Sequence, residues 1–119
     1  MYPDQLPFSV SLMSQSEMLA EKIRALMTRE KARDLYDVWF LLENNIKVER
    51  SMVDAKLQYY SRRFDPAELE SSVMRKMGIW ESELEPLIFG PLPEFEEIAK
   101  KVVNEIGKNI PGRTPEDRN

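Results

Sequence analysis

Residues 14–42 read SQSEMLAEKIRALMTREKARDLYDVWFLL, and this stretch decides the fold. It opens with Ser14 and Glu17 at the spacing of a capping box, in which two side chains satisfy free N–H groups at a helix start. Apolar residues then recur at helical spacing, at Met18, Leu19, Ile23, Leu26 and Met27. The pattern predicts a first helix that ends near Thr28.

A polar link at residues 29–31 leads to a second predicted helix, from about Ala32 to Glu43. Its apolar stripe consists of Leu35, Val38, Trp39 and Leu42. Because Phe40 and Leu41 widen this stripe, we expect the second helix to be the most buried one. The short link favours antiparallel packing of the two helices.

Three more helices are predicted downstream. The third runs from Ser51 to about Arg63. The fourth opens with Asp65 as N-cap and Pro66 in the first position, and Gly78 is expected to close it. A loosely defined segment, 80–89, follows. The last helix is expected from about Glu94 to Ile106, with Gly107 as its end and one apolar face made of Phe95, Ile98, Val102, Val103 and Ile106.

Both ends of the chain differ from this helical pattern. Residues 7–12 alternate apolar and polar side chains, which indicates a short strand or an extended arm. Residues 109–119 are polar with two prolines and are expected to be a disordered tail. The prediction is therefore a mainly α protein: an arm at 1–13, a bundle of five to six helices at 14–108, and the tail.

The amino-acid composition excludes several classes of site and of catalysis. The 119 residues suit one domain, and the absence of Cys and His excludes disulfide scaffolds, thiolate nucleophiles, His-based catalysis and zinc ribbons. The net charge of −4 disfavours an RNA-binding surface, which needs a basic face. We find no membrane-span pattern and no signal-peptide pattern, so a cytoplasmic protein is expected.

Charge is concentrated in two segments. Residues 22–33 hold five basic side chains and one acid, a local charge of +4. Residues 81–97 hold six glutamates and no base, and we interpret them as solvated surface. The basic segment has two interpretations: a solvated helix face, or a receptor for phosphate groups formed by Lys22, Arg29, Lys31 and Arg33.

Two carboxylates, those of Asp34 and Asp37, come directly after the basic segment. They lie three residues apart, so they share one face of the predicted helix. In the structural interpretation, Asp34 stabilises the helix N-terminus and Asp37 pairs with Arg33. In the functional interpretation, these acids support a metal ion or orient the cations around a polyphosphate. The functional interpretation predicts an open hollow beside the positively charged corner between the two helices.

Residues 17–26 and 29–42 together follow the pattern E-x-x-A-x-K-x-x-A-x-x-x-R-x-x-x-R-D-x-x-D-x-x-x-L. This pattern closely resembles the C-terminal half of AbiEii-type nucleotidyltransferases, the toxins of abortive-infection and type IV toxin–antitoxin systems. The resemblance maps the family's lysine onto Lys22 and its Arg-Asp-x-x-Asp element onto Arg33, Asp34 and Asp37, with Arg29 nearby, and it implies that Lys22 contacts nucleotide phosphates. It also implies that Asp34 or Asp37 acts in catalysis or holds the basic groups in place.

The family's Gly-Ser motif and its metal-binding Asp-x-Asp have no counterpart in this sequence. The resemblance therefore implies a helical domain that contributes phosphate-binding residues and is inactive alone, with Mg²⁺ and NTP bound only if another half completes it. No metal ligand is predicted in the chain itself. The alternative function is a non-catalytic interaction module that forms a homodimer or binds a catalytic or antitoxin chain.

Overall fold

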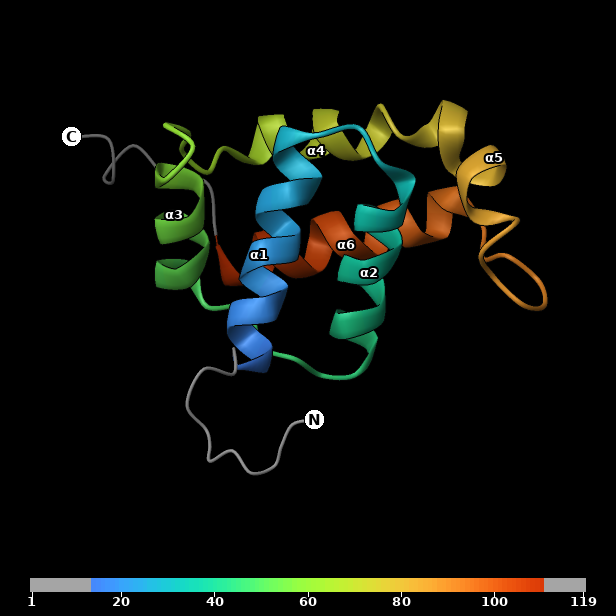
Figure 1. Ribbon diagram of the computed structural model, residues 1–119. Coiled ribbons are helices and arrows are strands. Elements are labelled where there is room, and N and C mark those ends of the chain that lie inside the picture. The colour runs from blue at the N-terminus through green and yellow to red at the C-terminus, as the bar shows by residue number, and fades with distance from the viewer. Residues whose placement is uncertain (1–13, 111–119) are drawn as a thin grey trace, which may run out of the picture.

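The computed structural model describes residues 14–110, so the predicted strand or arm at 1–13 lies outside the described residues. Residues 14–110 are mainly helical and contain no strand, which confirms the mainly α prediction (Figure 1). The helices are α1 (Gln15–Thr28), α2 (Ala32–Glu43), α3 (Arg50–Gln58), α4 (Pro66–Met74), the 3₁₀ turn η1 (Met77–Ile79), α5 (Trp80–Leu84) and α6 (Phe95–Asn109).

The first two helices form the predicted antiparallel hairpin, joined by the link at 29–31 (Figure 1). Ser14 caps α1, since its Oγ accepts a hydrogen bond of 3.0 Å from the Glu17 amide. The Glu17 carboxylate accepts instead from Lys56 Nζ on α3, at 3.1 Å. Ser14 therefore caps α1, whereas Glu17 holds α3 against α1 through its contact with Lys56.

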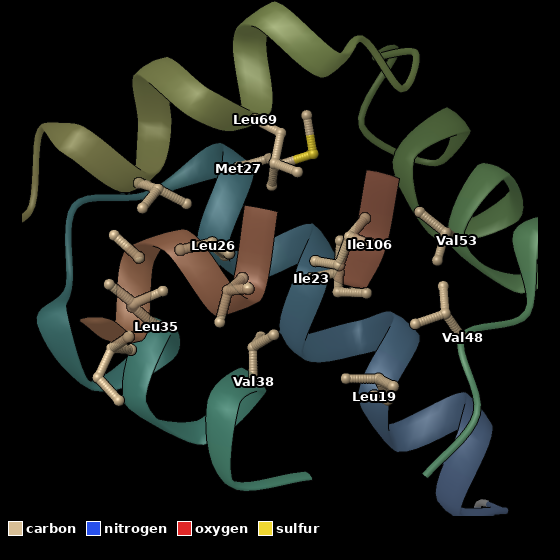
Figure 2. Close-up of a cluster of buried hydrophobic side chains, with 14 of the residues drawn as sticks. Leu19, Ile23, Leu26, Met27, Leu35, Val38, Val48, Val53, Leu69 and Ile106 are labelled. Atoms are coloured by element: carbon tan, nitrogen blue, oxygen red, sulfur yellow. The ribbon is translucent and has the colours of Figure 1, made fainter. Parts of the chain in front are cut away.

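The core is built around α1, which packs against α2, α3 and α4. Leu19, Ile23 and Leu26 are completely buried in the cluster that Figure 2 shows. The expectation that α2 is the most buried helix was wrong, because Phe40 is 52% exposed. Leu35 and Val38 face the core, but Phe40 lies on the opposite side of α2, where no described helix covers it.

The last helix, α6, crosses behind α1 and α2 and contacts both α2 and α4 (Figure 1). Its predicted apolar face is confirmed, with Val102 and Ile106 fully buried. The predicted end at Gly107 was wrong, since the helix continues to Asn109. Ile110, four residues after Ile106, is also fully buried, and this extra burial carries the helix past the glycine.

The third helix ends at Gln58, five residues before the predicted end at Arg63. The Arg62 amide bonds to Leu57 O at 2.9 Å, and the Ser61 amide to Gln58 O at 2.8 Å. Ser61 adopts φ 58°, the left-handed conformation that usually needs glycine at a helix end. Sequence spacing missed this stop because Ser61 is not a typical residue for it.

Asp65 and Pro66 open α4 as predicted, with Asp65 Oδ1 accepting from the Ala67 amide at 3.0 Å. The predicted closure at Gly78 was wrong, because α4 already ends at Met74 and Gly78 lies inside η1. The tighter turn there directs the Lys76 side chain into the core, where it is completely buried. The loosely defined segment after it contains the short helix α5.

Two cations close the C-terminal end of α1, which has no basic residue in its own last turn. Lys76 Nζ donates to Leu26 O at 3.0 Å and to Ser72 O at 2.9 Å. Arg62 Nη2 donates to Met27 O at 3.2 Å. Positive charge stabilises the free carbonyl groups at a helix C-terminus, so these two side chains tie α4 and the α3–α4 loop to α1.

Replacing Ser61 with Gly should raise the free energy of unfolding by about 0.5–1 kcal/mol, because glycine adopts positive φ without steric cost. Urea unfolding followed by circular dichroism measures this change. Asn45 is the matched control, since its φ of 62° is also positive but Asn tolerates it. Asn45→Gly should give a smaller gain, and a larger gain there would contradict the assignment of strain to Ser61.

Burial lowers the pKa of Lys76 below its ordinary value of 10.5. Between the lowered pKa and 10.5 the unfolded chain binds the additional proton, so the contribution of Lys76 to stability rises with pH in that window. The difference in unfolding free energy between wild type and Lys76→Met should therefore shift in favour of wild type as pH increases towards 10.5. A difference that is constant with pH would show that the ammonium group is not desolvated.

Candidate functional site

The predicted site residues surround the corner between α1 and α2, but they divide into two groups. On the inner side, Arg29 holds Asp34 with two hydrogen bonds, Nε to Oδ2 at 2.7 Å and Nη2 to Oδ1 at 2.9 Å. The Asp34 side chain is completely buried, whereas Arg29 is about half exposed. The hydrogen bond with Asp34 raises the pKa of Arg29 above its ordinary value.

Glu83 on α5 also contacts this corner, although the acidic segment to which it belongs was predicted to be solvated surface. Its Oε1 accepts from the Ala32 amide at 2.9 Å, which satisfies a free N–H group at the start of α2. Glu30, in the link, lies 3.0 Å from Arg75 Nε and 3.9 Å from Lys76 Nζ. No signal in the sequence identifies these contacts, because their partners are 45 or more residues away.

On the outer side, Lys22 Nζ donates to Asp37 Oδ2 at 2.9 Å, and each side chain is about one third exposed. The predicted pairing of Arg33 with Asp37 is therefore not the one observed. Arg33 and Lys31 are exposed and have no ion-pair partner within residues 14–110. The structure thus brings Lys22 and Asp37 together across two helices and leaves two cations beside the start of α2 open to solvent.

Apolar side chains flank the outer pair. Met18 lies one turn before Lys22 on α1 and is 41% exposed, and Phe40 lies one turn after Asp37 on α2. We call the surface formed by Met18, Lys22, Arg33, Asp37 and Phe40, together with Lys31, the α1–α2 face. It combines positive charge with exposed apolar area.

The charged residues of the α1–α2 face line none of the hollows found among the described residues. Three hollows lined by described residues lie elsewhere: one of about 630 Å³ beside α5 and the start of α6, one of about 540 Å³ at α3 and the α3–α4 loop, and one of about 450 Å³ between α1 and α3. None of them is lined by Lys22, Lys31, Arg33 or Asp37, so none is the hollow predicted beside the corner. Within residues 14–110 no cluster of three or more acids is placed to hold a metal ion.

Comparison with known proteins gives one match. A family model described as nucleotidyl transferase AbiEii toxin, type IV TA system, matches residues 1–102. No curated protein and no solved structure matches the chain. Among the described helices, none is long and apolar enough to cross a membrane.

The two aspartates should respond differently to amide substitution. Asp34→Asn removes a buried, charge-assisted contact and should lower the free energy of unfolding by about 2 kcal/mol. Asp37→Asn alters a partly exposed ion pair and should lower the free energy of unfolding by less than about 1 kcal/mol. Thermal and urea unfolding of both variants measure the difference. Equal losses would contradict the division of the corner into a buried structural pair and an open pair.

Proposed function

Because the chain belongs to the AbiEii family of nucleotidyl transferase toxins of type IV toxin–antitoxin systems, we propose that its α1–α2 face binds the phosphates of a nucleoside triphosphate. The observation that carries this proposal is the combination of a partly exposed ion pair, Lys22–Asp37, with two exposed cations at the start of α2, Lys31 and Arg33, that have no ion-pair partner among the described residues. Phosphoryl transfer depends mainly on the placement of charge around the phosphates.

The chemistry of Lys22 suits this role. An ammonium group has three N–H donors, and the described structure uses one of them for Asp37. The remaining donors and the exposed part of the side chain are available to phosphate oxygens. Arg33, one turn before Asp37 on the same helix, adds a planar guanidinium that can bind a phosphate through two parallel hydrogen bonds.

The two acids receive different roles in the proposal. Asp37 is the acid that a ligand can reach, and it orients the ammonium group of Lys22 for the phosphate. Asp34 has no exposed surface, and both of its oxygens already accept from Arg29. We therefore assign Asp34 a positioning role: it fixes Arg29 and the direction in which α2 leaves the corner.

The described residues do not fit a magnesium site, since no cluster of three or more acids lies close together among them. The sequence also contains no Gly-Ser followed by Asp-x-Asp. We propose that the chain binds the triphosphate weakly and does not transfer nucleotides alone, and that a separate lobe supplies the metal-binding acids. The position of the described hollows away from Lys22, Arg33 and Asp37 supports this, because a second lobe would then have to enclose a ligand bound there.

A second candidate function is a non-catalytic interaction module, and the exposure of Met18 and Phe40 favours it. Exposed apolar side chains beside a charged pair are typical of protein interfaces. In this alternative, the α1–α2 face binds a protein, such as the antitoxin that the family description leads us to expect, without a nucleotide. Nucleotide binding distinguishes the two functions.

Calorimetric titration of the chain with a nucleoside triphosphate and Mg²⁺ should give weak, salt-sensitive binding. Lys22→Ala should reduce the affinity about tenfold, which corresponds to one charge-assisted hydrogen bond. Lys100→Ala is the matched control, because Lys100 is an exposed lysine on α6, and it should bind like wild type.

Absence of heat in wild type, or equal loss in Lys22→Ala and Lys100→Ala, would contradict nucleotide binding at this face and favour the interaction module. Circular dichroism of each variant verifies that it is folded. Because Lys22 and Asp37 form a partly exposed pair, we expect Lys22→Ala to lower stability by less than about 1 kcal/mol.

A further inference from the structure

A hollow of about 630 Å³ lies at the end of the molecule formed by α5 and the start of α6. Its floor contains Trp80 and Phe95, whose rings pack edge to face with centroids 5.6 Å apart. Trp80 Nε1 donates to Pro93 O at 3.0 Å, which holds the loop that forms one wall. Leu87 and Phe89 in the same loop are 62% and 103% exposed. The hollow thus offers an apolar floor with further exposed apolar side chains nearby.

The rim of this hollow carries four exposed glutamates: Glu81, Glu85, Glu94 and Glu96. None of them has an ion-pair partner within residues 14–110, and no basic side chain lines the hollow. An occupant therefore needs both aromatic or apolar groups for the floor and positive charge for the rim. We call this surface the acidic hollow.

The chain itself carries a segment with this complementary chemistry, Tyr59-Tyr60-Ser61-Arg62-Arg63. Tyr59 is 88% exposed and Tyr60 is about half exposed. Arg63 is exposed and has no ion-pair partner within the described residues. The left-handed turn at Ser61 separates the two aromatic rings from the two guanidinium groups, and such strain is often kept where a surface has a function. We call this segment the basic corner.

The acidic hollow and the basic corner lie at opposite ends of the molecule, next to α5 and α3 respectively (Figure 1). One copy therefore cannot bring its own corner into its own hollow. The four glutamates of the hollow and Arg63 of the corner have no ion-pair partner among the described residues, and Tyr59 is largely exposed, so each surface has the chemistry that the other lacks. An RNA strand would fit the basic corner but not four carboxylates, and a foreign cationic peptide would leave the corner uncovered.

We propose that the acidic hollow of one copy receives the basic corner of a second copy. Tyr59 then packs over the apolar side chains of the hollow, and Arg63 pairs with the glutamates of the rim. Arg62 and Tyr60 keep their contacts within the copy, to Met27 O and to the Arg24 guanidinium. Two different patches meet in such a contact, so a pair of copies retains one free hollow on one copy and one free corner on the other. Copies consequently add head to tail. The contact uses no residue of the α1–α2 face and is independent of nucleotide binding.

Sedimentation velocity of the full chain tests this proposal. At about 0.1 M salt, where charges interact over about 10 Å, the sedimentation coefficient should rise with protein concentration. At about 1 M salt, where the range is about 3 Å, it should return to the monomer value. A monomer at every concentration in low salt would overturn the proposal, as would association that is insensitive to salt.

Two single variants make the test specific. Glu85→Lys removes charge complementarity from the hollow, and Arg63→Glu removes it from the corner, so each variant alone should be monomeric. Matched controls are Glu70→Lys on α4 and Lys100→Glu on α6, which change the charge equally at exposed positions outside both surfaces. Both controls should associate like wild type. Circular dichroism melts confirm that all four variants fold.

Mixing the two single variants gives the decisive result. The Glu85→Lys variant has an intact corner and the Arg63→Glu variant an intact hollow, so the mixture should associate although each variant alone does not. A mixture that sediments like its separate components would overturn the proposal. So would loss of association in the control variants.

Discussion

The packing of the helices depends on two cations that bind the free carbonyl groups at the C-terminal end of α1. The ammonium group of Lys76 and the guanidinium group of Arg62 bind the carbonyl groups of Leu26 and Met27, which have no partner inside the helix. Both cations come from later elements of the chain, so the same contacts that stabilise α1 also position α4 and the α3–α4 loop. A buried ammonium without these acceptors would cost several kcal/mol, and this penalty makes the arrangement specific.

The corner between α1 and α2, which begins at this end of α1, determines which charges remain available to a ligand. Arg29 and Asp34 face each other on the inner side and satisfy one another, so the acid is closed to solvent. Lys22 and Asp37 lie on the outer side and are only partly covered. The buried Arg29–Asp34 contact therefore fixes the corner, and the Lys22–Asp37 pair stays open to a ligand. This division suits a domain that offers positive charge to a ligand while another lobe provides the remaining groups.

Local signals in the sequence predicted much of the fold. The bounds of α2 and the start of α4 at Asp65 and Pro66 were correct, because stripes and caps within a few residues determine them. The predicted stop at Gly78 was wrong because α4 already ends at Met74, and the predicted stop at Gly107 was wrong because burial of Ile110 carries α6 past the glycine. The site was predicted only in part. Asp37 could be placed on a helix face, but its pairing with a lysine 15 residues earlier follows from the tertiary packing of two helices.

The most direct test of the account is the location of triphosphate binding, measured by chemical-shift changes in two-dimensional NMR spectra of the labelled chain during titration with a nucleoside triphosphate. The account predicts that the largest changes occur at Lys22, Lys31, Arg33 and Asp37, with little change around the arginines that follow α3. Changes confined to Arg62 and Arg63, or none in the α1–α2 face at saturating ligand, would contradict it.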